Sequence, residues 1–319
     1  MITSVSLIII GFACLIFGGN WLVDGASALA KRNNISDLII GLTIVSFGTS
    51  APELVVNSLA SFKGHSDIVF GNIIGSNNFN LFVILGISAL IYPITVQATT
   101  AKREIPISLV AAIVLLLLAN DFFIDRETEA SRLDGIILLA LFLFFLYYVF
   151  MQQKVDRAEV ITYKSKKESN FKIWSLIILG VLGLMLGGKL VVDNSVEIAE
   201  TLGVSQKIIG LTIVAMGTSL PELATSVIAA IKKNSDIAIG NIIGSNIFNI
   251  FLIIGVSALV SPINYSTAFN QDIYILIGGT VFLILAMFIG KKRKLDRWEA
   301  FILLAFYLGY TTYLVSLEM

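Results

Sequence analysis

Long apolar stretches separated by short polar segments run along the whole chain. Ten of them approach the roughly 20 residues that a helix needs to cross a membrane. We predict spans at 3–29, 38–62, 67–92, 103–120, 133–152, 171–199, 207–231, 236–260, 271–290 and 298–317. Gly, Ser, Thr, Asn and Pro interrupt the second, third, seventh and eighth spans. The pattern therefore predicts an all-α integral membrane protein with ten transmembrane helices.

Composition excludes most other classes of protein. Of the 319 residues, 56% are hydrophobic and 14% are charged, whereas soluble domains carry about 25% charged residues. The 22 basic and 22 acidic residues balance, so charge gives no indication of a nucleic-acid partner. Cys14 and His65 are the only residues of their types, which argues against a disulfide and against a zinc or haem site. A metal site would therefore use oxygen ligands, which favours Ca²⁺, Mg²⁺ or Na⁺.

The distribution of basic residues predicts the orientation in the membrane. Of the 22 Lys and Arg residues, 17 lie on one set of alternating loops. Because cytoplasmic loops carry an excess of Lys and Arg, we place these loops in the cytoplasm and both termini outside. The sequence contains no organelle-type leader and no large regulatory insert, which favours the plasma (inner) membrane of a prokaryote. The lipid bilayer is an expected partner, and no required protein partner is evident.

The chain contains an internal duplication. Residues 41–94 and 210–263 share 33 identities in 54 positions at a constant offset of 169, including GTS-x-PEL and GNIIGSN-x-FN in both copies. We predict a first five-helix repeat at 1–152, a cytoplasmic linker at 153–170 and a second repeat at 171–319. Since five spans are an odd number, the second repeat should be inverted relative to the first, as in many secondary transporters.

Glu53 and Glu222 occupy equivalent positions within the interrupted second and seventh spans. A carboxylate at membrane depth is costly and normally faces a partner or a cavity. A pseudo-two-fold axis would bring the two glutamates together at the midplane, where a divalent cation, several Na⁺ ions or protons would neutralise them. The alternative is a protonated carboxyl that is hydrogen-bonded inside the helix bundle.

Polar residues beside the glutamates add further oxygen atoms. Pro52 and Pro221 cannot donate backbone hydrogen bonds, so carbonyls near 46–49 and 215–218 are expected to be free. Candidate hydroxyl and amide ligands are Thr49, Ser50, Ser76, Asn80, Thr218, Ser219, Ser245 and Asn249. A second group could line the site or serve only as interhelical hydrogen-bonding residues: Asn72, Asn77, Asn241 and Asn246.

At these motifs the chain resembles the cation/calcium exchanger superfamily, specifically its prokaryotic sodium/calcium exchanger branch. The two copies of GTS-x-PEL and GNIIGSN-x-FN are similar to that family's two alpha repeats, and with the span count the resemblance covers essentially the whole chain. It implies a secondary antiporter that exchanges Na⁺ for Ca²⁺ by alternating access. It also implies that the first and sixth spans slide across the other helices.

The resemblance also implies roles for individual residues. Glu53 and Glu222 would ligate Ca²⁺ and share Na⁺, and the carbonyls of Thr49 and Thr218 would complete the Ca²⁺ site. The outer Na⁺ sites would be lined by Ser46, Ser50 and Ser76 and by Ala215, Ser219 and Ser245. Asn80 and Asn249 would border the central site. Ca²⁺ and Na⁺ would be the transported ions, with no organic cofactor.

Individual residues also indicate which branch of the superfamily the chain resembles, and they leave some alternative functions open. Potassium-dependent relatives have Asp where this chain has Asn249, so we expect no K⁺ transport. Proton-coupled relatives have GN-x-x-E where this chain has GTS-x-PE, so Na⁺ coupling is favoured over a Ca²⁺/H⁺ antiporter. Ser46 stands where Ala is common, and its additional hydroxyl could change the ion affinity. A cation channel is a further alternative, whereas an intramembrane enzyme is disfavoured because a metalloprotease would need histidines that the spans lack.

Overall fold

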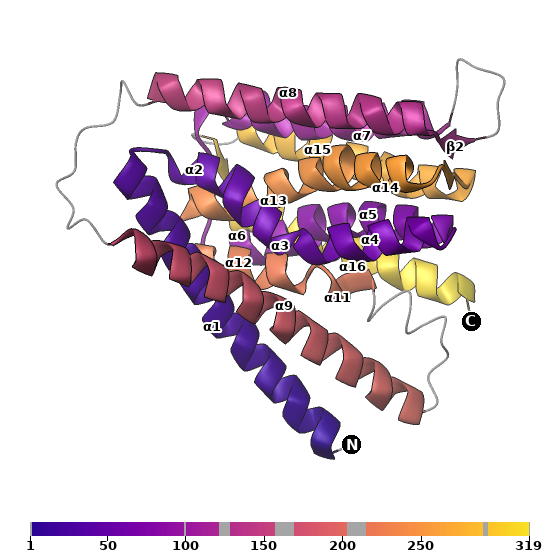
Figure 1. Ribbon diagram of the computed structural model, residues 1–319. Coiled ribbons are helices and arrows are strands. Elements are labelled where there is room, and N and C mark those ends of the chain that lie inside the picture. Colours follow the sequence, from indigo (N-terminus) through magenta and orange to yellow (C-terminus); the bar gives the residue numbers. More distant parts are fainter. Residues whose placement is uncertain are drawn as a thin grey trace.

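Helices follow the predicted spans along most of the chain (Figure 1). The structure is a computed structural model that describes residues 2–98, 100–120, 128–156, 169–202, 215–289 and 293–318. Most of the predicted linker and the first part of the predicted seventh span lie outside these described residues.

The first half of the chain supplies α1 Ile2–Asn33, α2 Asp37–Ile40, η1 Gly41–Val45, α3 Ser46–Thr49, α4 Ala51–Phe62, α5 Ser66–Asn78, η2 Phe79–Ile84, α6 Leu85–Ile91, η3 Thr100–Glu104, α7 Ile105–Ala119 and α8 Arg132–Asp156. The second half supplies α9 Asn170–Thr201, α11 Ala215–Gly217, α12 Leu220–Ile231, α13 Ser235–Ile247, η5 Phe248–Ile254, α14 Gly255–Val260, η6 Thr267–Phe269, α15 Asn270–Ile289 and α16 Arg297–Glu318. The segments η1, η2, η3 and η5 are π-helical, and η6 is a 3₁₀ helix.

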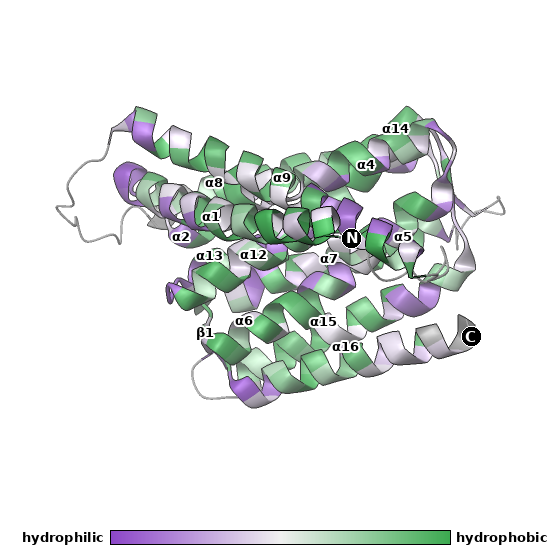
Figure 2. Cartoon of the chain, turned by 90° about the horizontal axis from the view of Figure 1, so that it is seen from below, coloured by the Kyte–Doolittle hydropathy of each residue, from purple (hydrophilic) through white to green (hydrophobic). Residues whose placement is uncertain are grey.

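The described helices are those of a multi-pass membrane protein. Within the described residues, six helices are long and apolar enough to cross a membrane, and a seventh is obtained if the bent pair Asp37–Thr49 and Ala51–Phe62 forms one span. Hydrophilic residues gather mainly at the two ends of the bundle, and hydrophobic residues run along the helices between them (Figure 2). The count of ten spans remains a prediction.

Two equivalent segments form the centre of the bundle. In each of Ser66–Ile91 and Ser235–Val260, 83% of the most apolar stretch of 18 residues is buried inside the protein. In the other four candidate spans the buried share of the corresponding stretch is 28–39%. Protein therefore surrounds these two segments on nearly all sides, while the others present wide faces to lipid. A polar side chain on a central segment avoids the hydrocarbon, which explains why such apolar spans can carry Ser and Asn.

The long helices α1 and α9 cross each other closely at one side of the bundle (Figure 1). A Cβ atom added at Gly18 would lie 2.7 Å from the backbone nitrogen of Leu184, and one added at Gly187 would lie 2.7 Å from the carbonyl oxygen of Gly11. Small residues at such crossings let two membrane helices approach at backbone distance. With the repeat offset of 169, Gly11 corresponds to Gly180 and Gly18 corresponds to Gly187. Equivalent residues of the two repeats therefore form the crossing on both helices.

Two short ribbons lie at opposite ends of the bundle. Strand β1 (Ile94–Thr95) pairs antiparallel with β4 (Lys294–Leu295), and β2 (Glu129–Ala130) pairs antiparallel with β3 (Ile263–Asn264). Strand β1 lies on the left in Figure 2, and β2 lies on the right in Figure 1. Left and right are the same in both figures, because the second view is the first one turned about the horizontal axis. Ile94 and Ile263 end the two copies of the repeated Pro-Ile motif, so each copy finishes in a strand.

Candidate ion-binding site

Both copies of GTS-x-PEL break a helix in the same way. Ser50 separates α3 from α4 with φ −86° and ψ 7°, and Ser219 precedes α12 with φ −87° and ψ 6°. Pro52 and Pro221 lie in the first turns of the helices that restart, where the missing N–H of proline costs nothing. The sequence motif thus forces an equivalent break in each copy.

Each break places a glutamate in the first turn of a new helix, Glu53 in α4 and Glu222 in α12. The N-terminal end of a helix carries a partial positive charge that favours a carboxylate. Both residues are only 1% exposed, and none of the ion pairs found among the described residues includes either of them. The helix ends therefore compensate these buried groups only in part.

Hydrogen bonds join the two halves directly at the carboxylates. The Ser50 hydroxyl donates to Oε1 of Glu222 over 2.9 Å. The Thr49 hydroxyl donates to Oδ1 of Asn241 over 3.1 Å, and the equivalent Thr218 hydroxyl donates to Oδ1 of Asn72 over 3.0 Å. The structure therefore brings the predicted residues of each broken helix against the central segment of the other repeat.

Four asparagines form reciprocal amide contacts between α5–η2 and α13–η5. Asn77 Nδ2 donates to the Asn246 carbonyl over 3.2 Å, and Asn246 Nδ2 donates to the Asn77 carbonyl over 3.3 Å. Asn80 Nδ2 donates to Oδ1 of Asn246 over 3.1 Å, and Asn249 Nδ2 donates to Oδ1 of Asn77 over 2.9 Å. We call these four residues the asparagine ladder. Asn80 and Asn249 lie in the π-helices η2 and η5, a type of segment frequent at functional sites.

Seven of the predicted site residues share one chemical property, which is a buried side-chain oxygen atom without a hydrogen-bond partner. These atoms, found within the described part of the chain, are Oε2 of Glu53 and Glu222, Oδ1 of Asn80 and Asn249, and Oγ of Ser76, Ser219 and Ser245. An unsatisfied buried polar atom costs about 1–3 kcal/mol. Hard cations such as Ca²⁺ and Na⁺ bind carboxylate, amide and hydroxyl oxygens, so this donor set fits such an ion.

The site contains only two carboxylates. Among the described residues there is no group of three or more His, Cys, Asp or Glu side chains that could hold a metal ion. A cation bound between Glu53 and Glu222 would therefore depend on the neutral oxygen atoms for the rest of its coordination.

Ser46 differs in part from its expected role. Its single hydroxyl hydrogen is shared between the carbonyl of Gly41 at 2.7 Å and the carbonyl of Asn241 at 3.1 Å, and the second contact links the first broken helix to α13. Its carbonyl, which Pro52 was expected to leave free, accepts the amide of Ser50 over 2.9 Å and the hydroxyl of Thr49 over 3.3 Å. Ala215 begins α11, and the residues directly before it lie outside the described part of the chain.

Sequence reasoning left the roles of Asn72, Asn77, Asn241 and Asn246 open. The structure uses all four as bridging residues that position the threonines and the other asparagines of the site. The available signal was their exact repetition at the offset of 169. Repetition alone, however, does not tell an ion ligand from a residue that holds one in place.

Fold and site define the protein as a multi-pass helical membrane protein with a buried pair of carboxylates among neutral oxygen atoms. Residues 3–151 and 172–316 match the family model described as sodium/calcium exchanger protein. The chain belongs to the sodium/calcium exchanger family, whose members are transporters and not enzymes.

Relatives and solved structures agree with this assignment. The chain is 33% identical to the sodium/calcium exchanger MaX1 of Methanosarcina acetivorans, covering 95% of this chain and 96% of that one. It is 36% identical to the inner membrane protein YrbG of Escherichia coli, covering 82% and 81%. The sodium-calcium exchanger NCX_Mj soaked with zero Na⁺ and Ca²⁺ superposes with a TM-score of 0.83 at 32% identity, covering 98% and 99%. NCX_Mj soaked with 2.5 mM Na⁺ and 0.1 mM Ca²⁺ gives a TM-score of 0.82.

We predict that the asparagine ladder supports cation binding. Replacing Asn77 with Ala removes the acceptor of the Asn249 amide, and Asn246→Ala removes the acceptor of Asn80. Each should weaken the affinity for Ca²⁺ about tenfold, equivalent to about 1.4 kcal/mol. The measurement is the rise in unfolding temperature of the purified protein as Ca²⁺ is titrated.

Asn78→Ala is the matched control, because Asn78 is buried beside Asn77 but donates to the Asp272 carbonyl. An equal loss in all three variants would contradict a specific role for the ladder.

Proposed function

We propose that this protein is a secondary active antiporter that moves Ca²⁺ across the membrane in exchange for Na⁺. The observation that carries the proposal is the buried pair Glu53 and Glu222, whose Oε2 atoms have no partner, together with the unpartnered side-chain oxygens of five other predicted site residues. Two carboxylates and a divalent cation balance in charge, and several Na⁺ ions achieve the same balance. Family membership and the named relatives support the choice of ions.

Na⁺ rather than H⁺ is the proposed coupling ion. The hydroxyl and amide oxygens of Ser76, Ser245, Asn80 and Asn249 supply neutral ligands that a Na⁺ ion uses and a proton does not need. The repeated GTS-x-PE motif supports the same choice through its resemblance to sodium-coupled relatives. Ca²⁺/H⁺ antiport is the alternative that the transport experiment below separates, and K⁺ is not expected as a substrate because position 249 is Asn.

We further propose ten spans arranged as two inverted five-helix repeats, 1–152 and 171–319, joined by the linker 153–170. Reciprocal contacts support this arrangement, because adding or subtracting 169 converts Thr49–Asn241 into Thr218–Asn72. The same operation exchanges the two arms of the asparagine ladder. An inverted repeat is the usual basis of alternating access, in which two halves exchange conformations around a fixed site.

The proposed moving part is the α1/α9 pair. In the structure α9 packs against both helix breaks. The side chain of Val181 lies next to Gly48, and that of Val192 lies next to Gly217. Applying the repeat operation, the opposite state would place Val23 of α1 beside Gly48. Sliding of the pair would thus exchange α9 for α1 at the breaks and open the site to the other side.

The proposed location is the plasma (inner) membrane, with both termini outside. The concentration of basic residues on one set of loops supports this orientation.

The first prediction from the proposed function concerns the coupling ion. Vesicles containing the protein and loaded with Na⁺ should take up ⁴⁵Ca²⁺ without a pH gradient, and choline-loaded vesicles should not. Glu53→Gln or Glu222→Gln should reduce uptake to background, because each removes one of the two charges that balance Ca²⁺. Glu104→Gln is the matched control, since Glu104 is equally buried at 1% exposure but is bonded to Tyr148, away from the site. Uptake that requires a pH gradient instead of Na⁺ would assign the protein to the proton-coupled class.

The second prediction concerns alternating access. The Cβ of a side chain at position 48 would lie 4.0 Å from that of Val181, within the 3.5–4.5 Å range of disulfides. In a Cys14→Ser background, oxidising the pair Gly48→Cys and Val181→Cys should stop exchange, and reduction should restore it. The pair Val23→Cys and Gly48→Cys should also cross-link, but only in protein that can change state. Full exchange activity in completely cross-linked protein would refute a moving α1/α9 pair.

The third prediction concerns orientation. A small epitope tag added at either end of the chain should be reached by an antibody from outside intact spheroplasts. Protection of both tags until the membrane is permeabilised would reverse the proposed topology.

A further inference from the structure

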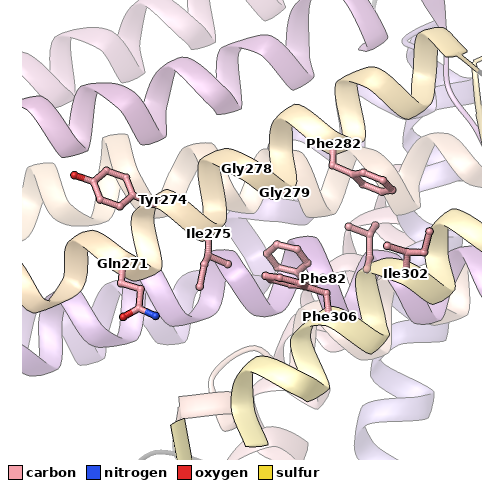
Figure 3. A pocket seen from close by; sticks show the side chains of 10 residues that line it. Phe82, Gln271, Tyr274, Ile275, Gly278, Gly279, Phe282, Ile302 and Phe306 are labelled. Atoms are coloured by element: carbon pink, nitrogen blue, oxygen red, sulfur yellow. The ribbon is translucent and has the colours of Figure 1, made fainter. Parts of the chain in front are cut away.

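We propose that a groove between α15 and α16 binds one acyl chain of a membrane phospholipid. The groove has a volume of about 470 Å³ and is lined mainly by apolar side chains of α15 and α16, with Phe82 of η2 at its base (Figure 3). Gly278 and Gly279 widen it, because neither places a side chain in the space.

The polarity of the groove matches an amphiphile. Gln271 and Tyr274 lie at one end, and the aromatic and aliphatic side chains of Phe282 and Ile302 lie at the other (Figure 3). Next to the polar end, the Tyr310 hydroxyl donates to the carboxylate of Asp272. A phospholipid could therefore place its headgroup at Gln271 and Tyr274 and direct an acyl chain toward Phe282.

The length of the groove matches one leaflet of the membrane. From Gln271 to Phe282 the helix rises about 16 Å at 1.5 Å per residue, close to half of the roughly 30 Å hydrocarbon thickness. An acyl chain that begins at the polar end of the groove would therefore reach about as far as the middle of the bilayer.

The groove is continuous with the surface that faces lipid. Leu285 and Phe288 of α15 and Phe301 and Leu308 of α16 are exposed large hydrophobic residues on the same two helices. In a bilayer these side chains are surrounded by acyl chains, so a chain can enter the groove sideways without passing through water. None of the described residues that line the groove is charged.

An acyl chain at this place would contact the turn that carries a site residue. Phe82 lies in η2 two residues after Asn80, and its ring packs against Phe306 with a centroid distance of 5.3 Å. A Cβ atom at position 279 would collide with the Phe82 ring, so Gly279 is what allows the ring to reach α15. A bound chain would press on this ring and so limit the movement of η2.

The test uses two glycine substitutions that differ only in place. Gly278 and Gly309 are both exposed, and a Cβ atom at either would have no neighbour within 4 Å. Gly278→Leu fills the groove, whereas Gly309→Leu adds the same side chain to α16 outside its lining. Each protein is reconstituted in vesicles of phosphatidylethanolamine and phosphatidylglycerol that contain a phosphatidylethanolamine with a photoreactive acyl chain, and the labelled peptides are mapped by mass spectrometry.

In the unmodified protein, labelling should concentrate on the peptides that contain Tyr274 and Phe306. Gly278→Leu should reduce this labelling at least tenfold, and Gly309→Leu should leave it unchanged. Equal labelling of all lipid-facing helices, equal loss in both variants, or cross-links between two copies of the chain at the groove would overturn the proposal. Because the readout is lipid labelling and not transport, its outcome is independent of which ions the protein exchanges.

Discussion

The structure is organised around the cost of holding two carboxylates inside a membrane protein without a basic partner. Glu53 and Glu222 are almost completely buried, and no lysine or arginine of the described residues pairs with them. The broken helices, the neutral oxygen atoms and the fully enclosed central segments each reduce that cost in part. None of them removes it, so the remaining cost favours neutralisation by a bound cation or by protons. In the proposed function the exchanged cations supply this neutralisation.

The polar groups at the site are divided between two tasks. The N–H groups of Asn77, Asn80, Asn246 and Asn249 are directed at other amide oxygens, which holds α5–η2 against α13–η5. The oxygens of Asn80 and Asn249 are left without a partner. In Asn80 and Asn249 the N–H groups are thus used by the structure while the oxygens stay open to the proposed cation, an arrangement that a neutral amide allows because it carries both kinds of group.

The duplication made most of this arrangement predictable. It identified Glu53 and Glu222 as a pair, located both helix breaks within a few residues and selected the Ser and Asn positions whose oxygens the structure leaves unpartnered. Hydrophobic periodicity could not predict the π-helical turns at Asn80 and Asn249, because a π-helix changes the register that the periodicity assumes. It also could not assign Asn72 and Asn241 to the threonine hydroxyls, since that choice depends on which helices cross. The sequence could not show that the carbonyl of Ser46 accepts the Ser50 amide, because it does not reveal that the break at Ser50 preserves this hydrogen bond.

The hydroxyl of Ser46 has a consequence for the energy of the proposed transport cycle. An antiporter built from two identical halves would have equal energies in its inward-open and outward-open conformations, because the repeat operation would convert one into the other. Ser46 anchors the first broken helix to α13, and its counterpart Ala215 has no hydroxyl with which to form the equivalent bond. The repeat operation therefore does not convert one half exactly into the other at this position, so the two conformations of the proposed cycle are not required to be equal in energy. A difference of this kind would change how often the empty carrier faces each side, whereas the ion gradients set the direction of net exchange.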